Sequence, residues 1–245
     1  MILQDKVAIV TGAGSGLGRA FALGLAREGA RVAVADLAEE RASQVAQEIA
    51  ATGGKALPVV VDVSQTPQVQ GAVDRVRFQL GAPDILLNAA GIYPRRSVME
   101  MPDEEWDRMI AIHLRGTFLF CRAVLPDMVQ RGNGKIVNVA SSIGLKGAVN
   151  GAHYAAAKGG IIAFTRSLAM EMAPHGVSVN ALCPGQTDTP LWRLGYPPEE
   201  ADRMASAGNV GRPDDLVGCV VFLCSDQSRP LTGQIMLRDI PMKGL

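Results

Sequence analysis

The chain has 245 residues, of which 48% are hydrophobic, and its 24 basic residues equal its 24 acidic residues. This length and composition are sufficient for one full hydrophobic core, so we expect a single domain over residues 1–245. The balanced charge argues against a basic surface that would attract nucleic acid or an anionic membrane. We therefore expect a small-molecule substrate as the partner, with no nucleic acid and no membrane.

No basic stretch with a long apolar run precedes the first apolar segment at Val7. No window of the sequence reaches the roughly 18 uninterrupted apolar residues of a membrane span. We expect a cytoplasmic protein.

The cysteines lie inside apolar segments without the paired spacing of metal ligands, so buried apolar packing is favoured over a disulfide or a zinc site, and no metal is assigned. They are Cys121, Cys183, Cys219 and Cys224.

Short apolar, β-branched segments alternate with helical stretches along the chain. The predicted strands cover residues 6–11, 31–36, 57–62, 84–88, 135–141, 177–183 and 234–238. Because these segments are apolar almost throughout, they predict an α/β fold, a doubly wound parallel sheet of Rossmann type with about seven strands and helices on both faces. Ligands bind such sheets at the carboxyl ends of the strands. The residues that end or directly follow the first six predicted strands are Gly12, Asp36, Asp62, Asn88, Ser141 and Pro184.

A glycine-rich segment follows the first predicted strand and precedes an alanine-rich helical stretch. It contains Gly12, Ser15, Gly16, Leu17 and Gly18. Glycines allow a backbone to approach a pyrophosphate, and the N-terminus of a helix offers free N–H donors and the positive end of a dipole. The segment therefore predicts a dinucleotide site.

Asp36 ends the second predicted strand, at the distance from the glycine segment where a carboxylate accepts hydrogen bonds from both ribose hydroxyls of an adenosine. The same carboxylate would repel a 2′-phosphate, and neither Ser15 nor Leu37 supplies a compensating cation. NAD is therefore favoured as the cofactor. NADP is the less favoured alternative, which Arg41 keeps open because it is within reach of the region.

Tyr154 and Lys158 are four residues apart at the start of a long helical stretch, and Ser141 lies a short loop upstream. One helical turn places the phenol and the ammonium on the same face. With a hydroxyl nearby, this pair can move a proton on or off an alcohol or carbonyl oxygen. Lowering the pKa of the Tyr154 phenol by about three units takes roughly 4 kcal/mol, which the ammonium and the positive ring of NAD would supply. The set indicates an oxidoreductase.

The substrate pocket is expected from residues that follow Gly91, follow Ser141, or come after the sixth predicted strand. They are Ile92, Tyr93, Ile143, Val149, His153, Gln186, Leu191, Trp192 and Tyr196. Most are apolar or aromatic, which favours a secondary alcohol or ketone with a hydrophobic or ring-bearing body. The least regular segment, at about 187–213, is predicted to be a mobile flap over the site, with an ordinary connecting loop as the alternative.

Four cations lie near this pocket in the sequence, and solvated surface charges are favoured over a site for a carboxylate or a carrier-bound acyl group. They are Arg95, Arg96, Lys146 and Arg193.

Taken together, these motifs resemble the short-chain dehydrogenase/reductase family from about Lys6 to Asp239. The motifs are the glycine spacing, the segment Asn88-Ala89-Ala90-Gly91, the set Ser141, Tyr154 and Lys158, and Pro184-Gly185. The resemblance implies a general acid/base role for Tyr154, a role for Lys158 at the nicotinamide ribose, and a hydrogen bond from Ser141 to the substrate oxygen. It also implies a homotetramer. The further cofactor contacts that it implies are Asp62 and Val63 at the adenine, Asn88, Ala89 and Gly91 beside the central strands, and Pro184, Gly185, Thr187 and Thr189 at the nicotinamide.

Three positions depart from the family pattern. His113 stands where the family usually has an asparagine that holds a water beside the lysine, so His113 is predicted either to hold that water and change charge near neutral pH, or to be a satisfied buried side chain. Ala89 replaces a second asparagine, which we interpret as tolerated repacking. Ile240 and Pro241 follow Asp239 where the family commonly has two glycines, a change that bears on assembly.

Three functions remain open. The favoured one is an NAD-dependent oxidoreductase that transfers hydride between the cofactor and a secondary alcohol or ketone. The second is a 3-oxoacyl reductase acting on acyl-carrier or CoA thioesters, which Asp36 disfavours because NADPH is the more usual cofactor of that reaction. The third is a regulatory protein that binds NAD without turnover.

Overall fold

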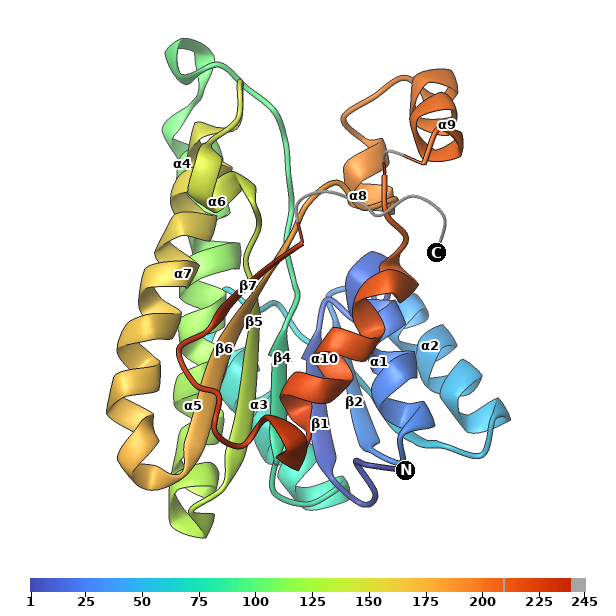
Figure 1. Cartoon of the computed structure of the whole chain (residues 1–245), viewed down its shortest axis with the longest axis vertical. Coiled ribbons are helices and arrows are strands. Elements are labelled where there is room, and N and C mark those ends of the chain that lie inside the picture. The colour runs from blue at the N-terminus through green and yellow to red at the C-terminus, as the bar shows by residue number, and fades with distance from the viewer. Residues whose placement is uncertain (209, 239–245) are drawn as a thin grey trace.

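Seven parallel strands run through the centre of the molecule in the order β3-β2-β1-β4-β5-β6-β7 (Figure 1). The computed structural model describes residues 1–208 and 210–238, so the expected change at Ile240 and Pro241 lies outside the described residues. The sheet confirms the predicted doubly wound α/β fold, with strand ends shifted by two residues at most. The strands are β1 Val7–Thr11, β2 Arg31–Asp36, β3 Lys55–Val60, β4 Ile85–Asn88, β5 Gly134–Val139, β6 Val177–Pro184 and β7 Ile235–Arg238.

Helices cover both faces of the sheet (Figure 1). On one face α1 packs against α2 and α10, and on the other α3 packs against α5 and α4 packs against α7. The helices are α1 Gly16–Arg27, α2 Glu39–Ala51, α3 Thr66–Gln79, α4 Asp103–Ile110, α5 Gly116–Arg131, α6 Ile143–Lys146, α7 Ala152–Met172, α8 Pro190–Arg193, α9 Pro198–Ser206 and α10 Val217–Cys224. Short 3₁₀ turns lie at Val98–Glu100, Ala173–His175, Pro213–Leu216 and Asp226–Ser228.

The double cover explains why the strands are apolar throughout. Every residue of β1, β4, β5 and β6 is buried. One core lies around Phe21 and the other around Phe120, each with under 2% of its surface exposed. Strand β3 is different because it lies at the edge, where Pro58 is tolerated without a missing ladder hydrogen bond in the sheet interior.

The ends of β1 and β4 meet where the strand order reverses, the position at which doubly wound sheets bind ligands. The Thr11 hydroxyl accepts hydrogen bonds from the amides of Ala89 and Ala90, at 3.0 and 3.2 Å. This contact holds the loop after β4 beside the loop after β1. Both loops therefore face the same opening.

A buried chain of amide side chains connects the centre of the sheet to α7. Asn88 on β4 donates to Asn138 on β5 at 2.9 Å, and Asn138 donates to the Thr165 hydroxyl on α7 at 3.0 Å. All three side chains are buried. Because a buried amide without partners costs free energy, this chain favours one placement of α7 against the sheet.

The segment at 187–213, expected to be the least regular, contains the short helices α8 and α9. Its ends meet at a bridge between Thr187 and Gly211, and the Asp188 amide donates to the Gly211 carbonyl at 2.8 Å. Arg193 on α8 donates to Asp202 on α9 at 2.7 Å, and to Asp188 just before α8 at 2.5 Å. Figure 1 shows this segment above the carboxyl ends of the strands. Its movement as a flap stays a prediction.

One helical stretch in the described part of the chain, Asp103–Arg131, is long and apolar enough to cross a membrane by length and composition. It consists of α4, a π-helical turn at Ala111–Arg115 and α5. The core helix of a folded domain passes the same test, and α5 packs against α3 and the central strands. The stretch is therefore weak evidence for a membrane span.

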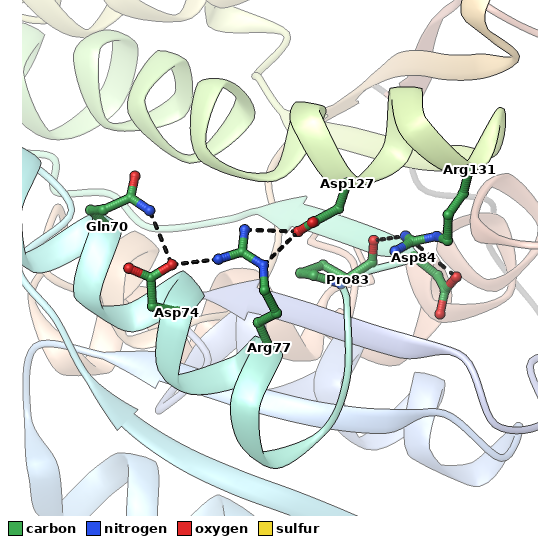
Figure 2. A network of polar contacts seen from close by, with 7 residues as sticks. All are labelled: Gln70, Asp74, Arg77, Pro83, Asp84, Asp127 and Arg131. Atoms are coloured by element: carbon green, nitrogen blue, oxygen red, sulfur yellow. Dashed lines mark hydrogen bonds and ion pairs between the residues drawn. The ribbon is translucent and has the colours of Figure 1, made fainter.

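A network of polar contacts ties α3 to α5 (Figure 2). Arg77 donates from Nε and Nη2 to the same oxygen of Asp127, at 3.0 and 2.8 Å, and also contacts Asp74 one turn earlier on its own helix. Asp127 has 17% of its side chain exposed and Asp74 has 52%. Arg131 donates to the Pro83 carbonyl at 2.5 Å, which fastens the end of α5 to the loop before β4.

We predict unequal effects for the two carboxylates that Arg77 contacts. Asp127→Ala should lower the free energy of unfolding by about 1.5 kcal/mol, because a two-donor, charge-assisted contact between helices is lost. Asp74→Ala should change it by no more than about 0.5 kcal/mol, because an exposed pair within one helix contributes little. Urea unfolding of both variants measures the difference, and equal losses would contradict it.

Candidate active site

The glycine segment turns tightly at the end of β1. Gly12 has a φ of 64°, and a Cβ built there would lie 2.7 Å from the Ala90 Cα. A Cβ on Gly18 would lie 2.2 Å from the Gly12 carbonyl oxygen. Neither position accepts a side chain, because the loop folds back on the first turn of α1 and lies against the loop after β4. Backbone therefore lines this part of the opening, as a pyrophosphate site requires.

Asp36, at the end of β2, holds the same loop. Its carboxylate accepts hydrogen bonds from the amides of Gly14 and Ala38, at 2.9 and 3.0 Å, and it has 8% of its surface exposed. Arg41 Nη2 lies 3.7 Å from the carboxylate. The end of β2 thus presents the Asp36 carboxylate with the Arg41 guanidinium beside it. Arg41, which the sequence places within reach of this region, forms an ion pair with Asp36.

A cavity of about 850 Å³ extends across the carboxyl ends of the strands. All the predicted cofactor residues line it except Asn88, which points into the sheet toward Asn138. The four residues predicted to be catalytic, Ser141, Tyr154, Lys158 and His113, line it as well. Within the described residues, no group of three or more His, Cys, Asp or Glu side chains is arranged to hold a metal ion.

Ser141, just after β5, comes together with Tyr154 and Lys158 on α7. The Ser141 side chain contacts the Tyr154 phenol, and Lys158 Nζ lies 5.5 Å from the centre of the Tyr154 ring. Lys158 also donates to the Val139 carbonyl at 2.6 Å. All three side chains are buried. The helical turn between the phenol and the ammonium therefore brings them together as the sequence spacing predicts.

Burial controls the protonation of this set in the protein alone. It lowers the pKa of Lys158 to about 7, because the ammonium has left water. It raises the pKa of the Tyr154 phenol, and the contact with Ser141 only partly opposes this rise. The sequence predicts that Lys158 lowers the pKa of Tyr154. In the protein alone the direction is opposite, because desolvation is the largest influence on the pKa of the buried phenol.

His113 lies in the π-helical turn between α4 and α5, an irregularity of a kind often found at functional sites. Its Nε2 lies 2.8 Å from the Ile92 carbonyl oxygen and 3.0 Å from the Ile92 amide, while its buried Nδ1 has no hydrogen-bond partner. Gly91 leaves room for the ring, because a Cβ there would lie 2.4 Å from His113 Cε1. The ring is therefore packed tightly, but only one of its two nitrogens has a hydrogen-bond partner.

The pKa of His113 lies well below its usual value, mainly because of burial and secondly because of Lys158. The ring is therefore neutral at neutral pH, and the expected change of charge there does not fit this environment. The unpaired Nδ1 does fit the other expectation, that His113 holds a water, which stays a prediction.

His153 is the predicted substrate residue that the structure places elsewhere. It is fully buried and does not line the cavity. Its Nε2 lies 3.5 Å from Glu105 on α4, and Glu105 in turn accepts from Arg96 at 2.9 Å. The reason is the helical geometry: residues 153 and 154 are about 100° apart around α7, so only Tyr154 can face the cavity. The other predicted pocket residues all line it: Ile92, Tyr93, Ile143, Val149, Gln186, Leu191, Trp192 and Tyr196.

An aromatic wall closes one side of the cavity. The ring of Tyr93 lies 4.2 Å from that of Tyr154, and Trp192 lies 4.9 Å from Tyr196, measured between ring centres. Arg95 lies between these two pairs, 5.3 Å from the Tyr93 ring and 4.9 Å from the Tyr196 ring. The wall joins the loop after β4 to helix α8 and the turn that follows it.

Sequence reasoning missed two kinds of residue. Arg108 on α4 lines the cavity, but it belongs to a polar helix with no motif around it. Asn138 and Thr165 support Asn88 from within the core, and only their polar character inside apolar segments could have indicated them.

Comparison with known proteins agrees with this geometry. Residues 6–197 match the family model described as short chain dehydrogenase. The chain is 36% identical over 240 residues to the 3-oxoacyl-[acyl-carrier-protein] reductase FabG of Thermotoga maritima, covering 96% of this chain and 97% of that protein. It is also 36% identical over 245 residues to the 2,5-dichloro-2,5-cyclohexadiene-1,4-diol dehydrogenase LinX of Sphingobium indicum, covering 99% and 96%.

A solved structure of a putative gluconate dehydrogenase from Agrobacterium tumefaciens superposes with a TM-score of 0.91 at 36% identity, covering 97% of this chain and 95% of that one. The matched family model spans most of the chain, and the relatives match it over nearly their whole length. Fold, site geometry and similarity agree, and the chain belongs to the short-chain dehydrogenase/reductase family of oxidoreductases.

Proposed function

We propose that the chain is an NAD-dependent oxidoreductase that transfers hydride between the cofactor and a secondary alcohol or ketone. The observation that supports this most directly is the single cavity that joins the glycine segment at the end of β1 to Tyr154 and its neighbours. One end of the cavity has the character of a dinucleotide site, and the other end has the groups that handle a proton.

The lining of the cavity fits a nicotinamide dinucleotide. The backbone at Gly12 and Gly18, where no Cβ is accepted, would hold the pyrophosphate, and Asp36 would hold the adenosine ribose. Asp62 and Val63 would line the adenine, and the residues from Pro184 to Thr189 would meet the nicotinamide. When bound, this cofactor supplies the hydride acceptor or donor.

The chain's own residues handle the proton. Tyr154 takes the proton of the substrate hydroxyl during oxidation or returns it during reduction, and Ser141 donates a hydrogen bond to the same oxygen. Lys158 favours the phenolate of Tyr154 when it is charged. His113 lines the same cavity and would hold a water through its unpaired Nδ1. These roles extend the contacts described above.

NAD is proposed over NADP on the strength of Asp36. Its carboxylate accepts from the Gly14 amide of the glycine segment and from the Ala38 amide just after β2, and these bonds would fix it where a 2′-phosphate would meet it. Arg41 weakens this discrimination, because its guanidinium lies beside the carboxylate and has 56% of its side chain exposed.

The substrate is proposed to have a hydrophobic or ring-bearing body, which the aromatic wall would contact. Two relatives support different substrates: the diol dehydrogenase agrees with a cyclic alcohol, and the 3-oxoacyl reductase keeps a thioester substrate as the second candidate. Cytoplasmic location and a homotetramer stay predictions from the sequence.

The proposed reaction predicts a specific effect of Tyr154→Phe. NADH formation from a panel of aliphatic, cyclic, aryl and hydroxyacyl secondary alcohols should fall about 10²–10⁴-fold in kcat/KM, because the phenyl ring keeps the packing against Tyr93 and removes only the acid/base group. The variant should keep the wild-type dissociation constant for NADH. Residual activity within tenfold of wild type would contradict the role of Tyr154.

Tight NADH binding by the wild-type chain without turnover of any alcohol in the panel would instead support the regulatory, binding-only alternative.

Cofactor choice can be measured as a ratio of dissociation constants. We expect NADH to bind at least about tenfold more tightly than NADPH, a difference of roughly 1.4 kcal/mol. Asp36→Asn should reduce this ratio, because it removes the charge that repels a 2′-phosphate, and its one amide oxygen can still accept from one of the two backbone amides. Arg41→Gln, measured beside it, should increase the ratio. Equal binding of the two cofactors by the wild-type chain would refute the assignment and favour the 3-oxoacyl reductase.

The lowered pKa of Lys158 predicts a pH-dependent cost in the cofactor-free protein. In the unfolded chain this lysine titrates near 10.4, whereas in the folded protein its pKa is about 7. Burial of the charged Lys158 therefore lowers the free energy of unfolding only slightly near pH 10. This loss of stability grows as the pH falls from 10 to 7 and reaches its full size below pH 7. Lys158→Met should be more stable than wild type at pH 7.

The advantage of Lys158→Met should shrink by about 3 kcal/mol between pH 7 and pH 9.5. Taking the difference between the two proteins at each pH removes the titration of buried groups on which Lys158 has no influence, such as Cys121 and Cys224. Urea unfolding at the two pH values measures it, and a constant difference would show that Lys158 keeps an ordinary pKa.

A further inference from the structure

Arg95 follows β4 by seven residues and lines the cavity. Its guanidinium lies between the rings of Tyr93 and Tyr196, and its Nη1 donates to the Gly195 carbonyl at 3.3 Å. A Cβ on Gly195 would lie 2.6 Å from Arg95 Cζ, so the backbone there packs directly against the guanidinium. Although the side chain starts from an exposed loop, its charged end is bracketed on several sides.

The neighbouring arginines are neutralised, and Arg95 is not. Arg96 pairs with Glu105 at 2.9 Å, and Arg193 pairs with Asp188 at 2.5 Å and with a second aspartate. No described carboxylate lies within ion-pair distance of Arg95. Arg95 therefore does not form an ion pair between the loop after β4 and the turn at Gly195, which would be its simplest structural role.

The carboxylates that line the cavity lie away from Arg95. Among the described residues they are Asp36, at the end of β2, and Asp62, just after β3. Both strands lie beyond β1, whereas Arg95 belongs to the loop that follows β4 on the other side of β1. A charge on the substrate near Arg95 would therefore meet a cation without a competing anion.

The contacts with Tyr93 and Tyr196 also preorganise the Arg95 guanidinium for binding a ligand. Stacking between aromatic rings fixes the plane of the guanidinium and removes part of its water before anything binds. A planar fork held in place recognises carboxylate or phosphate with little further loss of side-chain entropy. Tyr93 contacts both Arg95 and Tyr154, so the guanidinium lies one ring away from the phenol.

We propose that Arg95 determines specificity by binding an anionic group, a carboxylate or a phosphate, on the part of the substrate remote from the reacting carbon. The substrate class is then an anionic secondary alcohol or its ketone, with the charge a ring's width from the oxygen at Tyr154. This assignment rests on the proposed function for the location of the reacting carbon. The binding of the anion can be tested without turnover.

The first experiment measures binding of unreactive ligands to the full chain, with and without NADH, by calorimetry at low salt. The probes are cyclohexanecarboxylate, cyclohexyl phosphate and the neutral cyclohexanecarboxamide. The wild-type protein should bind at least one of the two anions about tenfold or more tightly than the amide, and the tighter of the two identifies the group. Arg95→Gln should bring that ratio to within about twofold, and Arg95→Lys should leave an intermediate ratio because the charge remains without the planar fork.

Arg96→Gln is the matched control, because it removes the same charge from the adjacent residue, which does not line the cavity. It should keep the wild-type ratio of anion to amide binding. Gly195→Ala tests the position of the guanidinium without removing it, and should lower the ratio because the added methyl group displaces Arg95. Equal binding of anion and amide by the wild type, or a ratio that survives in Arg95→Gln, would overturn the proposal.

The second experiment separates this proposal from the proposed function. KM and kcat are compared for 3-hydroxycyclohexanecarboxylate and its methyl ester. We expect Arg95→Gln to raise KM for the acid about tenfold or more while KM for the ester changes little. Turnover of both compounds with no effect of Arg95 overturns the anion site and leaves the dehydrogenase standing. Arg95-dependent binding of the unreactive anions without any turnover supports the anion site and counts against the dehydrogenase.

Discussion

The contact between the ends of β1 and β4 is the constraint on which the rest of the site depends. The Thr11 hydroxyl accepts from two amides of the facing loop, and Gly12 approaches Ala90 so closely that a side chain at position 12 has no room. Because the strand order reverses here, the helices after these strands lie on opposite faces of the sheet. The opening between them is where the glycine segment and the loop that includes Arg95 meet.

The groups that suit this site for chemistry are costly to bury. Lys158 has a lowered pKa, Tyr154 a raised one, and His113 has a ring nitrogen with no partner. Each departs from what a stable interior would contain. Two apolar cores, one on each face of the sheet, offset these costs. By contrast, the buried amide of Asn138, which has a structural role, is hydrogen-bonded to both of its neighbours.

Much of the fold could be predicted because parallel strands covered on both faces are apolar from end to end, and this pattern is visible in single segments. The site was predictable where a motif follows a strand end, as with Gly12, or recurs at a helical spacing, as with Lys158. His153 was misplaced because adjacent residues of a helix face different directions, and only the packing of α7 decides which of them enters the cavity. Arg108 was missed because long-range packing alone brings it there.

The tight fit between Gly91 and His113 has a consequence for how this chain could have evolved. The imidazole occupies the volume that any side chain at position 91 would need. A mutation at position 91 alone meets the ring, whereas a smaller residue at position 113 would first free the space. The two positions are therefore coupled, so the order in which they are substituted matters, although they are 22 positions apart in the sequence.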